Sequence, residues 1–266
     1  MNAAFDVGAD DGLHGLLFAF FNPKISVFGF EPIKNAKRKI LKNLRKVEKF
    51  FGIKIKNYKI INSAVSNFNG YAIFYENHYR VSSSLLKPKN RLSKCWTQSE
   101  DLLIKTVSKK MKIKKKYKVK VLTLEKFCKK NSIKIINYLH IDAQGHDLKV
   151  IEGLKGFRNY LIKGVSEISK NYHSNLYYRE KSFINLKKKF KLWKFKITNI
   201  ETVQKNMPYL NVEFMTSNEI SNEENKINFY YPSKRFGRMF KRIFLDKANF
   251  KDIVLLYFWK LKTRIL

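Results

Sequence analysis

The stretch AAFDVGADDG, residues 3–12, decides the fold of this chain of 266 residues. A short apolar run ends in Asp6, and a turn follows in which Gly8 and Gly12 bracket further acids. Glycine is scarce, with 11 residues in the whole chain, so two in one turn indicate a backbone that needs their conformational freedom. In open α/β sheets, ligands bind beyond the carboxyl ends of the strands. The stretch therefore predicts a first strand, a ligand-binding turn and the start of a helix.

Strands and helices alternate along the rest of the chain. Apolar runs predict strands at 3–7, 25–30, 58–62, 71–75, 119–122, 135–141, 161–167, 193–199 and 209–215. Amphipathic patterns predict helices at 12–20, 33–50, 123–131, 147–155 and 179–190. Short apolar strands alternating with helices are typical of a parallel sheet covered on both faces. We therefore expect an α/β fold with a doubly wound, mostly parallel sheet.

The charge of the chain is strongly positive. Lys and Arg total 55 against 21 Asp and Glu, which gives a formal net charge of +34. Such an excess could serve nucleic acid, an anionic membrane surface or an acidic substrate. A general compositional bias toward lysine with solvated faces explains it as well, so charge alone selects no partner.

The cysteines and apolar runs bear on the compartment. Cys95 and Cys128 form neither a disulfide framework nor a metal-ligand spacing, which indicates a reducing compartment. The apolar run LLFAFF at 16–21 follows acids rather than basic residues, so we expect no signal peptide. Other apolar runs are far shorter than the roughly 20 residues that cross a bilayer. We expect a soluble, cytoplasmic protein.

Three segments depart from the alternating pattern. We expect one domain over 1–216, interrupted by a lysine-rich insertion at 87–118 that acts as a mobile loop or lid. A linker at 217–232 leads to a tail at 233–266 with a helical, basic and amphipathic pattern. That tail could pack on the domain or rest on an anionic membrane at the inner membrane surface. The sequence leaves both readings open.

The second strand supplies a further ligand-binding signal. Glu31 ends the stretch SVFGFEP, in the position where an acid accepts the ribose hydroxyls of an adenosine. The first turn lacks the third glycine of the dinucleotide motif and carries acids where phosphates would lie, which is unfavourable by like-charge repulsion. S-adenosylmethionine has no phosphate and carries an ammonium and a sulfonium. The acids therefore favour S-adenosylmethionine, with Asp6 meeting the ammonium directly or through water.

The stretch YLHIDAQGHDLKVIEGL at 138–154 is the most specific in the chain. A buried strand delivers Asp142 to the same sheet edge, and Gly145 permits the turn that follows. Together with DVGADDG and FGFEP, and with SAVSNFNG, SSSLL, VKVLTLEKF and GVSEIS in order, it resembles the FkbM family of S-adenosylmethionine-dependent methyltransferases. The resemblance covers roughly residues 3–216.

The resemblance implies a seven-stranded, Rossmann-like class I methyltransferase fold and a set of cofactor-binding residues. It places Asp6, Gly8 and Gly12 at the methionine end, Glu31 at the ribose, and Ala64 and Val65 near the adenine. We also count Ala9, Pro32 and Asp142 among the cofactor-binding residues. Family members often read D-x-E-G-x-E where this chain has D-A-Q-G-H-D. Gln144 therefore weakens a carboxylate role at that position and leaves Asp142 as the better candidate.

Methyl transfer to a hydroxyl needs an aligned acceptor and a base that removes its proton. The candidates are Asp142, His146 and Glu167, with His173 in a following loop, and we favour Asp142 paired with His146. His146 could instead face water at a helix start, and Glu167 could be an ordinary strand residue. We expect no metal site, because five scattered histidines show no ligand spacing.

The acceptor is left with several hypotheses. The resemblance implies O-methylation of a hydroxyl on a glycan or a small-molecule secondary metabolite. The lysine tract at 105–120 and LKKKFKLWKFK at 186–196 raise an RNA methyltransferase as an alternative, since aromatics interleave with positive charge. A non-catalytic basic binding protein with a degenerate site is a third hypothesis, and the intact Asp6, Gly8, Glu31 and Asp142 argue against it.

Overall fold

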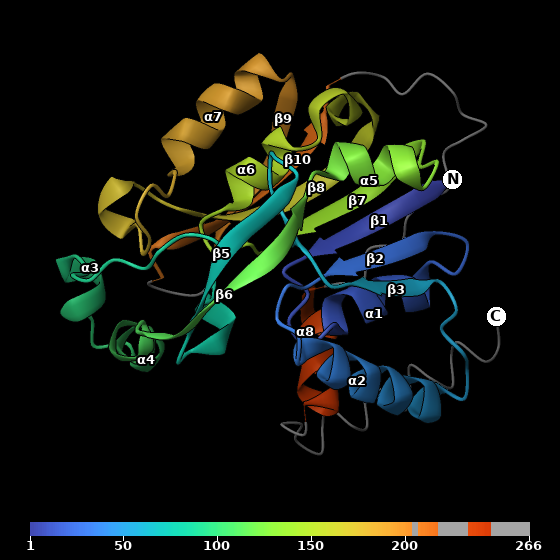
Figure 1. Ribbon diagram of the computed structural model, residues 1–266, viewed down its shortest axis with the longest axis horizontal. Coiled ribbons are helices and arrows are strands. Elements are labelled where there is room, and N and C mark those ends of the chain that lie inside the picture. The colour runs from blue at the N-terminus through green and yellow to red at the C-terminus, as the bar shows by residue number, and fades with distance from the viewer. Residues whose placement is uncertain (204–206, 218–233, 246–266) are drawn as a thin grey trace.

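A seven-stranded sheet forms the centre of the computed structural model, which describes residues 1–203, 207–217 and 234–245 (Figure 1). The strand order is β3-β2-β1-β7-β8-β10-β9. Their bounds are β1 Asn2–Val7, β2 Ser26–Phe30, β3 Tyr58–Ile61, β7 Ile135–Ile141, β8 Leu161–Ser169, β9 Phe195–Thr202 and β10 Tyr209–Thr216. Only β10 runs antiparallel to its neighbours in this sheet. The predicted doubly wound, mostly parallel sheet is confirmed.

Helices cover both faces of this sheet. One face carries α1 Leu13–Phe21, α2 Ala36–Phe51 and α8 Lys234–Phe244, and the other carries α5 Leu124–Lys130, α6 Asp147–Glu152 and α7 Phe183–Leu192. Neighbouring residues of a strand point to opposite faces. Ala4 accordingly packs with α1 and α2, whereas Phe5 packs with Leu124 and Phe127 of α5. Burial on both faces explains why the strands are continuously apolar rather than alternating.

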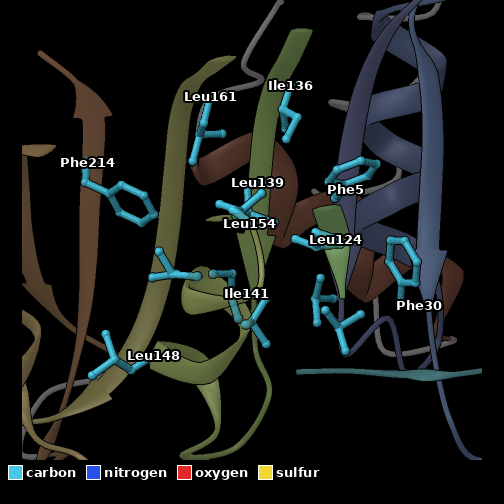
Figure 2. Packing of buried hydrophobic residues seen from close by; sticks show 14 of the residues in the cluster. Phe5, Phe30, Leu124, Ile136, Leu139, Ile141, Leu148, Leu154, Leu161 and Phe214 are labelled. Atoms are coloured by element: carbon cyan, nitrogen blue, oxygen red, sulfur yellow. The ribbon is translucent and has the colours of Figure 1, made fainter. Parts of the chain in front are cut away.

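The larger core cluster lies between the sheet and the helices α5, α6 and α7 (Figure 2). Phe5 and Leu139 are fully buried there, and Phe5 meets the ring of Phe127 edge to face at 5.9 Å between centroids. Truncating a buried phenylalanine to alanine costs about 3–5 kcal/mol. The central strands are thus firmly held, which fixes the loops at their ends.

A second, three-stranded sheet lies over the carboxyl ends of the central strands. Its order is β4-β6-β5, with β4 Ala64–Val65, β5 Gly70–Asn77 and β6 Ile113–Leu122. Phe74 and Val119 point from it into a small cluster with Ile33 and Ala36, at the start of α2. Sequence reasoning predicted β5 and part of β6 but not β4, which is only two residues long.

The lysine-rich range 87–118 is not the loop that the sequence suggested. It contains α3 Lys94–Thr97, α4 Leu102–Lys110 and the first part of β6. Trp96 is fully buried, and its indole Nε1 donates to the carbonyl oxygen of Ser174 at 2.9 Å. Ile104 and Val107 of α4 complete this packing against Tyr209. The apolar residues among the lysines form this small core, whereas a role as a lid stays a prediction.

The described part of the tail packs on the domain. Phe240 and Phe244 of α8 are buried against α1 and α2, and the rings of Phe51 and Phe240 stack at 6.3 Å. The predicted linker, apart from its first residue, and the tail beyond residue 245 lie outside the described residues. Within the described ranges, no helix has both the length and the apolar character that crossing a membrane would require. The apolar face of α8 is therefore used within the protein.

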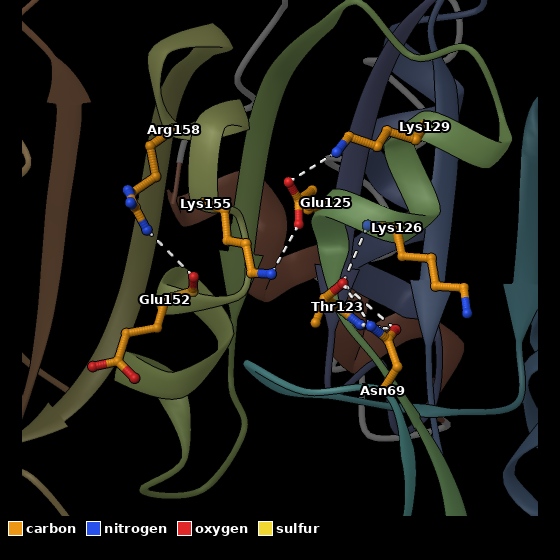
Figure 3. Close-up of polar contacts among 8 residues, drawn as sticks. All are labelled: Asn69, Thr123, Glu125, Lys126, Lys129, Glu152, Lys155 and Arg158. Carbon is orange, nitrogen blue, oxygen red and sulfur yellow. Dashed lines mark hydrogen bonds and ion pairs between the residues drawn. The ribbon is translucent and has the colours of Figure 1, made fainter.

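Polar contacts fasten the ends of the short helices (Figure 3). The hydroxyl of Thr123 caps α5 by accepting from the backbone N–H of Lys126 at 3.1 Å. Glu125 pairs with Lys129 at 3.0 Å and with Lys155 at 3.3 Å, the latter in the 3₁₀ helix η2 Lys155–Tyr160. Exposed ion pairs of this kind contribute at most about 1 kcal/mol each. They orient α5 and η2 rather than hold the fold.

Gly8 joins the ends of three central strands. Its φ is +83°, and its backbone N–H donates to the carbonyl oxygen of Phe30 at 3.0 Å. A Cβ at this position would lie 1.9 Å from the carbonyl oxygen of Asp142. Asp142 in turn donates its backbone N–H to the carbonyl oxygen of Val7 at 2.9 Å. Only glycine lets β1, β2 and β7 end this close together.

We expect Gly8→Ala to lower the free energy of unfolding by more than about 2 kcal/mol, because it adds both left-handed strain and a clash with backbone. Gly52→Ala, with φ +70° and open space around it, should show the strain alone, about 1–2 kcal/mol. Gly156→Ala meets nothing within 4 Å and should be nearly neutral. Urea unfolding measures all three. Equal stability of the Gly8 and Gly156 variants would contradict this account of the turn.

Candidate active site

A cavity of about 260 Å³ opens at the carboxyl edge of β1, β2 and β7, beneath the small sheet. Among the residues predicted from the sequence, it is lined by Gly8, Ala9, Glu31, Pro32, Ala64, Val65, Asp142 and His146. Asp6, Gly12 and Glu167 do not line it. The structure thus brings together the ends of β1, β2 and β7, as the sequence predicted.

Glu31 stands at the end of β2 with its carboxylate in the cavity wall. Its Oε1 accepts from the backbone N–H of Ile33 at 2.8 Å, and its Oε2 accepts from that of Asp10 at 2.9 Å. Burial raises the pKa of Glu31 to about 7, with the two backbone hydrogen bonds opposing the increase. Each carboxylate oxygen keeps a second acceptor position. Glu31 is therefore oriented to accept two hydroxyls from a ligand.

The acids of the first turn have partners inside the protein. Asp11 Oδ1 accepts from the backbone N–H of Leu13 at 3.0 Å, and Asp6 Oδ2 accepts from that of Gly15 at 2.9 Å. Both amides belong to the first turn of α1, where a diphosphate would otherwise bind. Asp10 pairs with Arg80 and, at 3.6 Å, with Lys39. The turn thus seals the amino end of α1 with carboxylates.

Asp6 is fully buried, and the structure places it behind the cavity wall. Its Oδ1 lies 2.8 Å from Nδ1 of His140, a residue to which the sequence assigned no role. His14 lies next to this pair, with its ring 4.3 Å from that of His140, and lines the cavity. The predicted contact between Asp6 and the ammonium of a cofactor stays a prediction, and it would have to pass through an intervening group.

Asp6, His14 and His140 are the group of described residues with metal-ligand atoms within 4.8 Å of one another. Both oxygens of Asp6 already accept hydrogen bonds, and the positive end of the α1 dipole lies beside it. We therefore interpret the group as a hydrogen-bonded cluster and assign no metal to it.

Asp142 follows β7 and is held by the turn after it. The side-chain amide of Gln144 donates to Asp142 Oδ1 at 2.6 Å. Gln144 has a φ of +53°, and the Tyr177 hydroxyl lies 3.1 Å from its Oε1. An amide at 144 thus supports the carboxylate, where the glutamate usual in the family would place a second negative charge. The departure from the family pattern has a structural consequence at Asp142.

His146 lies at the start of α6 with its Nε2 2.8 Å from the hydroxyl of Ser66. The side-chain amide of Asn67 donates to Glu152 at 3.0 Å, so Asn67 Oδ1 is turned toward Ser66 and accepts its proton at 3.3 Å. Ser66 can then only accept from His146. The chain of donors assigns the Nε2–H tautomer and leaves Nδ1 as an acceptor.

His146 is neutral at physiological pH. Burial and, to a lesser extent, the charge of Lys149 lower its pKa to about 4, while Glu152 opposes both effects. Its Nδ1 is buried and has no hydrogen-bond partner among the described residues. An unpaired buried acceptor is costly unless a ligand supplies a donor. His146 therefore offers the cavity wall a neutral acceptor.

Glu167 belongs to a group of acids behind Asp142. Burial and the charges of Asp142, Asp147 and Glu180 raise its pKa well above the usual value. Asp147 is fully buried, and burial raises its pKa too. Glu180, whose pKa is raised to about 7 by burial, accepts from the backbone N–H of Leu176 at 2.7 Å. The raised pKa of Glu167 makes it a weak candidate for an ionised base.

Sequence reasoning missed cavity residues that arrive from other segments. Arg80, from the 3₁₀ helix η1 Arg80–Ser82, lines the cavity and pairs with Asp10. Ser63 and Ser83 also line it. Ser63 and Ser83 lie in the stretches SAVSNFNG and SSSLL, which contributed to the family resemblance without singling out either serine. No local pattern marks Arg80, because its position depends on how β5 folds over the edge of the main sheet. His173, the loop candidate, is exposed in the 3₁₀ helix η3 Tyr172–Ser174.

The strand order with one antiparallel strand, and a cavity bounded by Gly8 and Glu31, define a class I S-adenosylmethionine-dependent methyltransferase. The sequence model of the methyltransferase FkbM domain matches residues 6–178. The chain therefore belongs to the FkbM methyltransferase family, and its cofactor is S-adenosylmethionine. Glu31 and the apolar wall of Pro32, Ala64 and Val65 fit the ribose and adenine of that group.

Several solved structures are similar to this chain. The methyltransferase FkbM from Methylobacillus flagellatus is 11% identical, with a TM-score of 0.48, over 81% of this chain and 44% of that one. The chain thus spans less than half of that protein. The N-terminal domain of human METTL16 in complex with S-adenosylhomocysteine is 10% identical, with a TM-score of 0.39, over 82% of this chain and 62% of that one.

TrmK from M. capricolum, in complex with S-adenosylhomocysteine, is 12% identical with a TM-score of 0.39, over 99% of this chain and 91% of that one. No curated protein sequence matches the chain. None of these likenesses identifies the methyl acceptor.

We expect the affinity for S-adenosylhomocysteine to rise between pH 6 and pH 8, because Glu31, with a pKa of about 7, accepts both ribose hydroxyls only when ionised. Glu31→Gln should weaken binding about tenfold or more at pH 8, since hydrogen bonds to a charged group are the stronger ones. It should also flatten the pH dependence. Calorimetry at three pH values measures both effects.

Glu100→Gln removes an exposed carboxylate and is the matched control, with binding expected to equal that of the wild type. A Glu31→Gln variant that keeps the full pH dependence would remove Glu31 from the ribose site.

Proposed function

We propose that this methyltransferase methylates a hydroxyl oxygen, on a glycan or on a small-molecule secondary metabolite. One observation carries the proposal. Asp142, held by Gln144, and the neutral His146 line the same cavity as Gly8 and Glu31. Two proton acceptors therefore stand beside the place where the cofactor binds.

Gly8 and Glu31 are proposed to hold the cofactor and align its methyl group. S-adenosylmethionine, when bound, supplies a methyl group on a sulfonium, and its transfer leaves a neutral thioether. Gly8 lets the backbone approach the cofactor, and Glu31 holds the ribose, which fixes the direction in which the methyl points. Alignment of this kind lowers a barrier by about 7–11 kcal/mol. The acceptor oxygen forms its new bond to carbon as the carbon–sulfur bond breaks.

An oxygen acceptor must lose its proton as it attacks. Asp142 is proposed to take it, and Gln144 holds the carboxylate in place by its 2.6 Å hydrogen bond. His146 is proposed to orient the hydroxyl through its free Nδ1, with the ring fixed by Ser66. Removal of the proton by a positioned base contributes about 10²–10⁴-fold in rate. A sulfur or nitrogen acceptor would need such a base less.

Two alternatives have specific support or opposition. An RNA acceptor is supported by the positive charge on one face of the small sheet, where Lys116, Lys118 and Lys120 of β6 are exposed. A non-catalytic binding protein is opposed by the cavity and its intact residues. The free thiols of Cys95 and Cys128 support a cytoplasmic, reducing location. Contact between the tail and a membrane has no support from the described part of α8.

Asp142→Asn should lower kcat about 10²–10⁴-fold, because an amide cannot take the acceptor proton. Gln144→Glu should move the acid limb of the pH–rate profile to higher pH, since a second carboxylate 2.6 Å away raises the pKa of the pair. The measurement is transfer of labelled methyl to a panel of polyhydroxylated acceptors, with the linkage identified by mass spectrometry. Methyl found on nitrogen, or a Gln144→Glu profile unchanged from the wild type, would contradict the proposal.

A further inference from the structure

One face of the small sheet pairs lysines with aromatic and aliphatic side chains. The antiparallel register sets Lys116 opposite Tyr75, Lys118 opposite Ile73, and Lys120 opposite Tyr71. Side chains two residues apart on a strand point to the same face. These six residues therefore share one face, here named the lysine ladder. The other face of the sheet packs Phe74 and Val119 toward the cavity.

The lysines of the ladder are not neutralised. All three are exposed, and none forms an ion pair with any residue in the described ranges. The six residues include no acid, and the nearby Glu76 on the other face accepts from the Tyr117 hydroxyl at 3.0 Å. Successive ladder lysines are about 6.8 Å apart along β6, two residues of an extended strand. They form a row of positive charges along one strand.

The apolar members of the ladder are unusually exposed for their size. Tyr71 is 63% exposed and Ile73 is 47% exposed. The Lys118 ammonium lies over the Tyr71 ring, 5.0 Å from its centre, so a positive charge and an exposed aromatic ring are in contact within the row. An exposed aromatic beside backbone-tracking cations is the arrangement on which unpaired bases stack.

We propose that the lysine ladder binds single-stranded nucleic acid, with phosphates along Lys116, Lys118 and Lys120 and a base stacked on Tyr71. The inference does not depend on which acceptor is methylated. It concerns a surface on the opposite side of the small sheet from the cavity.

The ladder favours a linear polyanion over a membrane. Its charges lie in one row along a strand, which matches a chain of regularly spaced phosphates rather than a plane of mobile headgroups. Tyr71 and Ile73 stand among the lysine side chains, where they can contact bases between phosphates. A duplex keeps its bases stacked inside, so it could use the lysines but not Tyr71.

The test is fluorescence anisotropy with a labelled single-stranded RNA of about 12 nucleotides, titrated at several salt concentrations. The triple variant Lys116→Gln, Lys118→Gln, Lys120→Gln should bind at least tenfold more weakly. Its plot of log affinity against log salt should be shallower by about 2, because each phosphate contact contributes about 0.7. Tyr71→Ala should weaken binding about tenfold and leave the salt slope unchanged. Unchanged circular dichroism and S-adenosylhomocysteine binding confirm that the variants are folded.

The matched control is Lys37→Gln, Lys42→Gln, Lys49→Gln on α2, which removes the same charge from another exposed, lysine-rich surface. This control should bind RNA nearly as well as the wild type. Equal losses in both triple variants would show attraction by net charge alone and overturn the proposal.

Three further probes are single-stranded DNA, duplex RNA and vesicles of anionic phospholipid. Single-stranded DNA should bind in the same way if base and phosphate are the recognised groups, and duplex RNA should bind without any effect of Tyr71→Ala. Binding of vesicles, with no binding of either single strand, would assign the ladder to a membrane and overturn the proposal.

Discussion

The site depends on the way two aspartates hold the amino end of α1. Asp6 and Asp11 accept hydrogen bonds from Gly15 and Leu13, the backbone groups on which a dinucleotide-binding fold would seat its diphosphate. Because these amides are taken and negative charge surrounds them, a phosphate at the turn would be repelled. A nucleoside that carries positive charge and no phosphate would not be repelled at this turn. The acids select the cofactor mainly by what they exclude.

A second constraint follows from the close meeting of strand ends at Gly8. The carbonyl oxygen of Asp142 occupies the space that a side chain at position 8 would need, so the turn after β1 and the turn after β7 are in contact. The small sheet closes over this junction with Phe74, and Arg80 anchors it through Asp10. The turns after β1 and β7 are thus built as one unit.

Much of the fold could be predicted from the sequence, because strands buried on both faces and amphipathic helices leave local patterns. The ends of β1, β2 and β7 were located by Asp6, Glu31 and Asp142, each at the end of an apolar run. The partners of those acids could not be predicted, since Asp6 binds His140 across two strands and Asp10 binds Arg80 from a distant segment. The negative charge of Asp6 suggested a contact with the ammonium of the cofactor. In the structure Asp6 is buried, and it accepts a hydrogen bond from the backbone N–H of Gly15. The helices α3 and α4 were missed because lysines outnumber their few buried residues.

The carboxylates at the amino end of α1 should admit a phosphate-free adenosine ligand and exclude a diphosphate. The most direct test is calorimetry of the wild-type protein with S-adenosylhomocysteine and, separately, with NADPH. Binding of S-adenosylhomocysteine with no detectable heat from NADPH is the predicted result. Binding of NADPH with comparable affinity would contradict the account.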